Sequence, residues 1–255
     1  MEPFAKRPER SVLLFDFDGV ISAIVADPAA ARPRPGAVEA LTGLAGDYLK
    51  VGVISGRPVS FLADALPLGL FLSGLYGMEE MVDGEVHTRR EFTAWHDVMA
   101  AALTDVRTAV SAGGPLSAVE VEDKGLSATL HYRGRPELAD VVPRLAESVA
   151  DAHGIDTRPA KMSVELHPPV PTDKGDVVRR VVSELSGVES VLYVGDDVGD
   201  LPAFDAVASL RARSIHAVSV AVATDELDHA VRDAADLVIA DADVVDLLCL
   251  LRPGR

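Results

Sequence analysis

The chain has 255 residues, 48% of them hydrophobic, which is enough to bury a full core in one large domain or in one domain that carries a second. Its formal net charge of -16 at pH 7 repels polyanions, so nucleic acid and anionic membrane surfaces are poor partners. Residues 1–10 form no signal-peptide-like apolar stretch, apolar runs elsewhere are too short for a membrane segment, and Cys249 has no disulfide partner, so we expect a cytoplasmic protein.

Short apolar runs rich in β-branched residues recur in the first and last thirds of the chain. They indicate buried parallel strands at residues 11–15, 51–54, 68–75, 191–194, 217–222 and 237–239. Amphipathic stretches between several of these runs indicate helices at residues 35–45, 59–66, 176–185 and 201–210. This alternation of strands and helices predicts an α/β fold with a doubly wound parallel sheet.

The middle of the chain has a different pattern. Two runs that alternate polar and apolar residues flank Asp123, Lys124 and Gly125, which predicts a β-hairpin. The expected order is strand 119–122, strand 126–131, helix 135–153, strand 155–158 and strand 162–166. Glycines and prolines border this segment. We therefore expect an inserted α+β cap at residues 113–170, within a core formed by residues 1–112 and 171–255.

The first strand leads directly into the sequence Asp16-Phe17-Asp18-Gly19. Because side chains alternate along an extended chain, Asp16 and Asp18 can face one site while Phe17 enters the core. Ligands of open α/β sheets bind beyond the carboxyl ends of the strands, where this pair lies. Two carboxylates in one site repel each other unless a cation neutralises them, and oxygen ligands suit Mg²⁺.

Three further segments carry polar groups that can join this site. Ser55, Gly56 and Arg57 follow the second strand, where a hydroxyl and backbone N–H groups can hold phosphate oxygens. Lys174 opens a helix after the cap, where its ammonium group can reach a phosphoryl group. Asp196 follows the strand at 191–194 in a run of three carboxylates. Each feature alone is also typical of a solvated turn or a helix cap, but their joint occurrence favours a phosphate site.

In order and context, these residues resemble the four motifs of haloacid dehalogenase-like phosphatases, and the resemblance covers nearly the whole chain. It implies that Asp16 is the nucleophile toward phosphorus and that Asp18 is the general acid and base. It implies that Ser55 and Lys174 hold phosphoryl oxygens. It also implies a Mg²⁺ cofactor bound by Asp16, the backbone carbonyl of Asp18, and Asp196.

The expected cap resembles that of the trehalose-6-phosphate phosphatases within this superfamily. The resemblance lies in the segments 122–124, 131–133 and 161–168, and in Leu75-Tyr76-Gly77-Met78-Glu79 of the core. It implies that charged cap residues bind the sugar hydroxyls, with Glu122, Lys124, Arg133, Lys161 and Glu165 as the matching candidates. The implied partner is a small sugar phosphate, with a functional link to a trehalose-6-phosphate synthase.

The chain departs from the family pattern at Val20, where threonine is common, at Gly199 and Leu201 in the last motif, and at His167, where arginine or lysine is usual. The departures at Val20, Gly199 and Leu201 leave fewer polar groups around the metal ligands, which bears on Mg²⁺ affinity. His167 bears more on substrate preference than on catalysis. Related activities on sucrose phosphate, mannosylglycerate phosphate or glucosylglycerol phosphate remain alternatives. A phosphomannomutase is a weaker one. A catalytically silent sugar-phosphate sensor is another, against which the intact aspartates and lysine argue. The absence of a GxGxxG pattern after the first strand excludes a Rossmann dinucleotide site.

Overall fold

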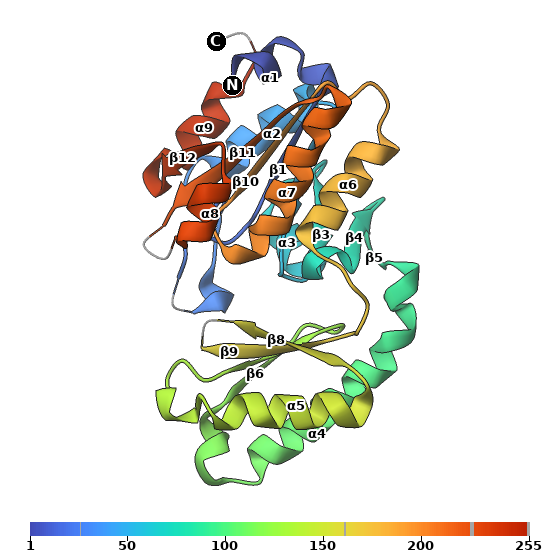
Figure 1. The fold of residues 1–255 in the computed structure, drawn as a ribbon, viewed down its shortest axis with the longest axis vertical. Helices are drawn as coiled ribbons and strands as arrows, with labels where there is room; N and C mark the ends of the chain where they lie inside the picture. The colour runs from blue at the N-terminus through green and yellow to red at the C-terminus, as the bar shows by residue number, and fades with distance from the viewer. Residues whose placement is uncertain (26, 161, 225–226, 254–255) are drawn as a thin grey trace. The chain divides into compact units, whose positions relative to one another are not determined.

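The computed structural model describes residues 1–25, 27–160, 162–224 and 227–253, and it contains two compact units (Figure 1). The first unit combines Met1–His87 with Thr172–Arg255, and the second is Thr88–Pro171. The second unit thus starts 25 residues before the expected boundary at 113. The reason is helix α4 (His96–Ser111), which was not expected from the sequence and which packs against helix α5 (Val141–His153).

The first unit is built on an eight-stranded sheet with the order β12-β11-β10-β1-β2-β3-β4-β5. Pairing is parallel from β12 to β3, and β4 joins β3 in the antiparallel direction. The strands are β1 (Ser11–Phe15), β2 (Lys50–Ile54), β3 (Phe71–Gly74), β4 (Glu79–Val82), β5 (Glu85–Thr88), β10 (Ser190–Gly195), β11 (His216–Ala223) and β12 (Leu237–Ala240). The strand expected at 68–75 begins only at Phe71, because Gly69 adopts a φ of 92° in the preceding turn.

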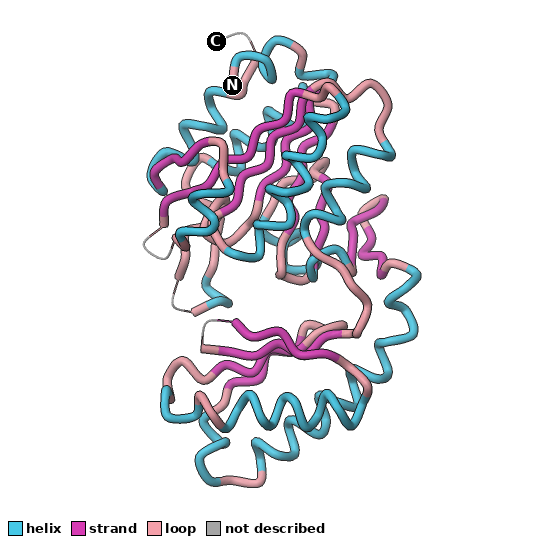
Figure 2. The backbone as a smooth tube through the Cα atoms, viewed as in Figure 1, coloured by secondary structure: helices cyan, strands magenta, loops and turns pink. Residues whose placement is uncertain are grey.

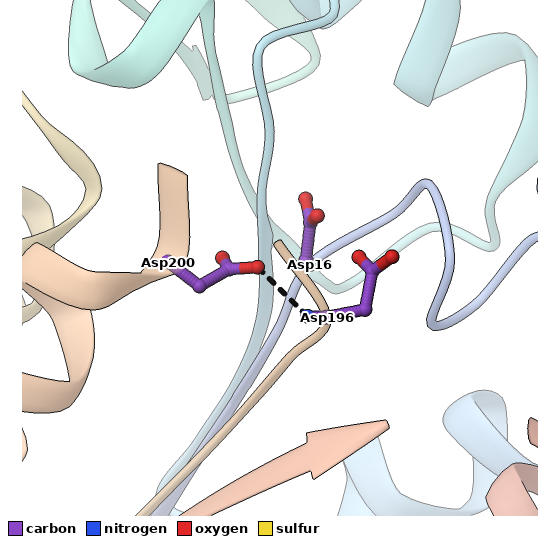
Figure 3. Close-up of side chains that lie close together, drawn as sticks. All are labelled: Asp16, Asp196 and Asp200. Atoms are coloured by element: carbon purple, nitrogen blue, oxygen red, sulfur yellow. Dashed lines mark hydrogen bonds between the residues drawn. The ribbon is translucent and has the colours of Figure 1, made fainter. Parts of the chain in front are cut away.

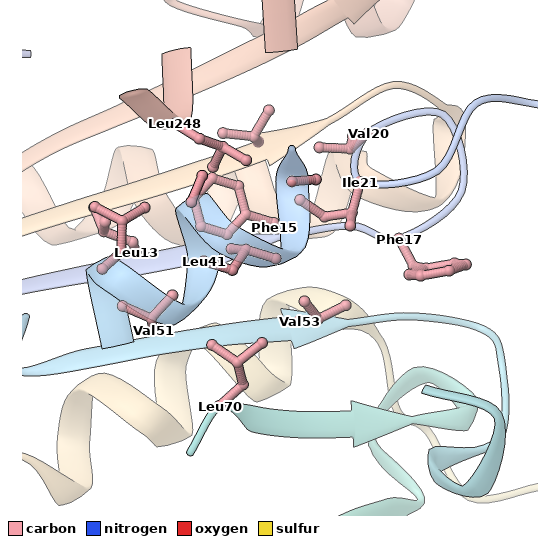
Figure 4. Packing of buried hydrophobic residues seen from close by; sticks show 14 of the residues in the cluster. Leu13, Phe15, Phe17, Val20, Ile21, Leu41, Val51, Val53, Leu70 and Leu248 are labelled. Atoms are coloured by element: carbon pink, nitrogen blue, oxygen red, sulfur yellow. The ribbon is translucent and has the colours of Figure 1, made fainter. Parts of the chain in front are cut away.

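Helices cover both faces of this sheet. Val12 and Leu14 of β1 point to one helical layer. Leu13 and Phe15, which Figure 4 shows, point to the other. The layer around Leu13 contains α2 (Ala37–Asp47), α3 (Val59–Ala65) and α9 (Val244–Leu250), and the N-terminal α1 (Glu2–Lys6) adds Phe4 to this layer. The opposite layer contains α6 (Lys174–Glu184), α7 (Leu201–Leu210) and α8 (His229–Ala234). Burial on both faces explains the apolar run from Val12 to Phe15 in β1 and confirms the doubly wound class.

The second unit has an antiparallel sheet with the order β6-β7-β9-β8. Its strands are β6 (Glu120–Asp123), β7 (Ala128–His131), β8 (Asp156–Ala160) and β9 (Ser163–His167). Figure 2 shows this small sheet beside helices α4 and α5. Val121, Leu130 and Val164 pair across neighbouring strands on the face that packs on the helices. Helix α5 starts later than residue 135, because the chain first makes a 3-10 turn at Pro136–Leu138.

No helix in the described part of the chain has both the length and the apolar character needed to cross a bilayer.

Candidate active site

Two parallel strands bring the first and last acidic motifs together. Strands β1 and β10 are neighbours, with Phe15 opposite Val194, so Asp16 and Asp196 leave the sheet side by side. The backbone N–H of Asp16 donates to the Val194 carbonyl at 2.8 Å, which fixes this register at the strand ends. Both aspartates are 4% exposed. The carboxyl edge of the sheet therefore holds two buried carboxylates, one from each of the two acidic motifs.

Lys174 lies at the start of α6 and points into this group. The Asp173 side chain caps the helix by accepting from the Asp176 N–H, which sets where the helix begins. The Lys174 Nζ lies 2.9 Å from Asp16 Oδ2 and 2.7 Å from Asp200 Oδ1. With only 3% of the residue exposed, the ammonium group is a buried cation held between two carboxylates.

Asp200 is the site residue that the sequence analysis did not single out. It is fully buried and accepts the Tyr193 hydroxyl at 2.6 Å. Its Oδ2 accepts the backbone N–H groups of Asp196 at 2.9 Å and Asp197 at 3.2 Å; the first of these bonds is drawn in Figure 3. The run of three carboxylates after β10 was the available signal, but linear spacing did not show which of them turns inward.

Asp16, Asp196 and Asp200 form a group suited to a divalent cation. One carboxylate oxygen from each lies within 4.8 Å of the others (Figure 3). Three buried carboxylates against one lysine leave an excess of negative charge, and an all-oxygen set matches the ligands that Mg²⁺ prefers. The side chain of Asp18 is outside this group, so its expected role in metal binding, which concerns its backbone carbonyl, stays a prediction.

Asp18 is held by Arg57. The Arg57 Nε and Nη2 groups each donate to one oxygen of the Asp18 carboxylate at 2.8 Å. The Arg57 Nη1 donates to the Pro28 carbonyl at 2.8 Å, and the guanidinium lies 4.6 Å from the centre of the Phe61 ring. In this structure Arg57, which was expected to bind substrate, thus forms an ion pair with Asp18, the expected general acid.

Ser55 and Gly56 follow β2, the strand next to β1 in the sheet. Ser55 is 2% exposed, and its Oγ accepts the Arg57 N–H at 3.1 Å. A Cβ at Gly56 would lie 2.8 Å from the Tyr76 ring, so the backbone approaches this ring too closely for a side chain at position 56. Both residues therefore lie on the sheet edge that carries Asp16, as the phosphate-site hypothesis requires.

Burial sets the protonation of the acidic group. Burial raises the pKa of Asp16 well above its ordinary value, although the charge of Lys174 acts in the opposite direction. Burial and the neighbouring carboxylates, first among them Asp200, raise the pKa of Asp196 to about 8. Burial lowers the pKa of Lys174, but Asp16 and Asp200 outweigh this effect and raise it well above its ordinary value. The lysine therefore stays charged, and Asp196 keeps its proton up to about pH 8.

These shifts predict a pH-dependent response to Mg²⁺. Since the pKa of Asp196 is about 8 in the folded chain and about 4 when unfolded, the folded state binds the extra proton. The contribution of Asp196 to the free energy of unfolding is complete below about pH 4 and is lost as pH rises through 8. Because Mg²⁺ must displace the proton from Asp196, its affinity is expected to rise between about pH 4 and pH 8.

The measurement is the melting temperature with Mg²⁺ or with EDTA at pH 5.5 and pH 8.5. At pH 8.5, Mg²⁺ at about 100 times its Kd is expected to add about 2.7 kcal/mol, or about 5–10 °C. The gain at pH 5.5 is expected to be clearly smaller. An equal or larger gain at pH 5.5 would show that the carboxylates are already ionised there.

Gly19 is required by the close approach of Asp196. It has a φ of 77°, and a Cβ there would lie 2.0 Å from Asp196 Oδ2. We expect Gly19→Ala to displace the Asp196 carboxylate and to lower kcat/KM for phosphate release by about 10²-fold. Gly46→Ala is the matched control, because a Cβ there meets nothing within 4 Å. Equal activities of the two variants would refute the packing argument.

In the second unit, three of the expected sugar-binding residues come together. The Lys124 Nζ lies 3.7 Å from Glu122 Oε2 and 3.5 Å from Glu165 Oε1. Arg133 is exposed in the loop after β7 and takes no part in the ion pairs described for this group. Lys161 lies outside the described residues, so its expected role is not tested. His131 joins the group instead, with its Nε2 3.0 Å from Glu122 Oε2.

Comparisons with known proteins identify the family of the chain. A family model described as trehalose-phosphatase matches residues 14–235. A trehalose-phosphate phosphatase of Mycobacterium ulcerans is 32% identical over 205 residues, which cover 78% of this chain and 52% of that protein. A relative with the same name from Mycolicibacterium paratuberculosis is 36% identical over 204 residues, covering 76% and 51%. The chain thus spans about half the length of these curated relatives.

Among solved structures, the C-terminal domain of a C. albicans trehalose-6-phosphate phosphatase has a TM-score of 0.73 at 22% identity, with 98% of this chain and 94% of that chain covered. At this identity the likeness concerns the fold, and it agrees with the α/β core and α+β cap described above. The family model covers most of the chain, including Asp16, Ser55, Lys174 and Asp196. On these grounds the chain belongs to the trehalose-phosphatase family.

Proposed function

We propose that the chain is a Mg²⁺-dependent phosphatase that converts trehalose 6-phosphate into trehalose and phosphate through an aspartyl-phosphate intermediate. The observation that carries this proposal is the buried group at the carboxyl edge of the sheet, where Lys174 contacts Asp16 beside Asp196. Membership of the trehalose-phosphatase family supports the substrate.

The residues of the first unit divide the chemistry between them. An oxygen of Asp16 attacks phosphorus, and the bond from phosphorus to the sugar oxygen breaks. Asp18 gives its proton to that oxygen and later takes a proton from the water that hydrolyses the aspartyl phosphate. Lys174 offsets the negative charge of the transferring group, and Ser55 and the N–H groups near Gly56 orient its oxygens. Because Arg57 occupies both oxygens of Asp18, this contact must open before Asp18 can deliver a proton.

The acidic group fits a magnesium ion. Asp16 and Asp196 would hold it together with the Asp18 carbonyl, and the inward carboxylate of Asp200 orients the surrounding groups through Lys174 and the Asp196 N–H. The ion supplies positive charge that reduces repulsion between an anionic nucleophile and an anionic phosphate.

We assign the recognition of the sugar to Glu122, Lys124, Arg133, Lys161 and Glu165. Acceptors and donors that lie side by side suit a polyol, because every sugar hydroxyl both donates and accepts. The contacts of Lys124 with both glutamates support this assignment for three of the five. A trehalose-6-phosphate synthase is the matching functional partner, since its reaction would supply the substrate.

The test is phosphate release from a panel of sugar phosphates with Mg²⁺, with EDTA as the matched control. We expect trehalose 6-phosphate to exceed sucrose, mannosylglycerate and glucosylglycerol phosphates by at least about 10-fold in kcat/KM, the scale of one or two specific hydrogen bonds. A preference for another sugar phosphate would leave the proposed phosphatase chemistry in place and would show that trehalose 6-phosphate is not the preferred substrate. Binding without release from any substrate would replace the enzyme with a sugar-phosphate sensor.

A further inference from the structure

One face of the small sheet in the second unit is polar across all four strands. The strand register places Glu122 of β6 opposite Thr129 of β7, Thr129 opposite Glu165 of β9, and Glu165 opposite Arg158 of β8. Residues paired directly across a sheet project from the same face. The row Glu122, Thr129, Glu165 and Arg158, which we call the polar row, thus lies on the face opposite the helices, with Thr129 near its centre.

The charged members of the polar row already have partners. Glu165 accepts the Ser127 hydroxyl at 2.8 Å and lies 3.5 Å from both Lys124 and Arg158. Glu122 contacts His131 and Lys124. These contacts pre-orient the two carboxylates before any ligand arrives.

Thr129 differs from its neighbours. The residue is 5% exposed, and its Oγ1 is buried without a hydrogen-bond partner. Within the described part of the second unit, no other buried side-chain nitrogen or oxygen lacks a partner in this way. An unpaired buried hydroxyl is unfavourable for folding by about 1–3 kcal/mol, and valine would have the same shape without that penalty. Packing therefore does not explain a threonine at this position.

We propose that Thr129 is a specificity-determining residue whose hydroxyl pairs with a hydroxyl group of the bound sugar. This inference rests on the proposed function, because it assumes that the polar row faces a sugar. The row offers carboxylate acceptors on both sides of Thr129 and a cation at Arg158, and Lys124 adds a second cation beside the two glutamates. The hydroxyl of Thr129 can donate to one sugar oxygen while the carboxylates on either side accept from neighbouring sugar hydroxyls and repel further negative charge, which selects a ligand with closely spaced hydroxyls.

The experiment compares Thr129→Val and Thr129→Ser in the full chain that also carries Asp16→Asn, so that trehalose 6-phosphate binds without turnover. Calorimetry is expected to show a Kd about 5- to 10-fold higher for the valine variant, the size of one neutral hydrogen bond. The serine variant is expected to stay within about 2-fold of its parent. Thr104→Val is the matched control, because its hydroxyl is exposed and bonds only within helix α4, to the Ala100 carbonyl.

Melting temperatures separate recognition from a structural role. Since valine removes an unpaired buried hydroxyl, the ligand-free Thr129→Val variant is expected to melt at or above the temperature of its parent. Weaker binding together with a lower melting temperature, or an unchanged Kd, would overturn the inference. The proposed function fails separately if the unsubstituted chain releases phosphate from p-nitrophenyl phosphate but not from trehalose 6-phosphate.

Discussion

Replacing Asp16 with asparagine is expected to lower phosphate release from trehalose 6-phosphate by about 10⁴-fold or more, because the covalent route has no other nucleophile. Asparagine has nearly the same shape, so the buried position beside Lys174 and Asp196 can be kept. The lysine retains its 2.7 Å contact with Asp200, which keeps it charged and in place. The loss should therefore appear in kcat with little change in the fold.

Intact-protein mass spectrometry after rapid acid quench provides an independent readout. The unsubstituted chain is expected to show a fraction with one added phosphoryl group during turnover, and the asparagine variant is expected to show none. Asp205→Asn on the exposed side of α7 is the matched control and should retain full activity. If the Asp16 variant kept more than about a tenth of the activity, a nucleophile other than Asp16 would be required.

The core of the first unit was largely predictable from the sequence. Strand β1 is buried on both faces, so Val12 to Phe15 are all apolar, and the motif that follows has to lie at the carboxyl edge. The same reasoning placed Asp196 after β10 and Lys174 at the start of α6, and the structure brings both to Asp16. Strands that are buried on both faces are recognisable in a sequence, because both faces have to be lined by apolar side chains.

Features that depend on the pairing of distant side chains were not predictable. Helix α4 buries Met99, Leu103 and Val106 on one side, but its place in the second unit follows from packing, chiefly against α5, that the sequence does not specify. Nothing in the spacing of Asp18 and Arg57, 39 residues apart, indicates that they pair. The polar row likewise requires the register of four strands, which depends on turns that the sequence specifies only loosely.

Asp200 illustrates the same limit and leads to the second large effect, which is on stability. Its carboxylate accepts from Lys174, from the Tyr193 hydroxyl and from two backbone N–H groups, with no exposed surface. Asp200→Ala would leave these donors buried without their acceptor. Removing one partner of a buried ion pair lowers the free energy of unfolding by about 3–5 kcal/mol. Part of this loss is offset, because the substitution also removes the repulsion of Asp200 from two neighbouring carboxylates. We expect a net loss of stability, because Lys174 would have Asp16 as its remaining carboxylate partner.

In EDTA, where no cation compensates, Asp200→Ala is therefore expected to lower the melting temperature by about 10 °C. Asp200→Asn keeps one acceptor oxygen, so its loss is expected to be smaller, and Asp205→Ala on the exposed side of α7 should be neutral. A melting temperature of Asp200→Ala within about 2 °C of the unsubstituted chain would mean that carboxylate repulsion cancels the ion pair. Asp200 would then contribute to the position of Lys174 and the Asp196 backbone without a net contribution to stability.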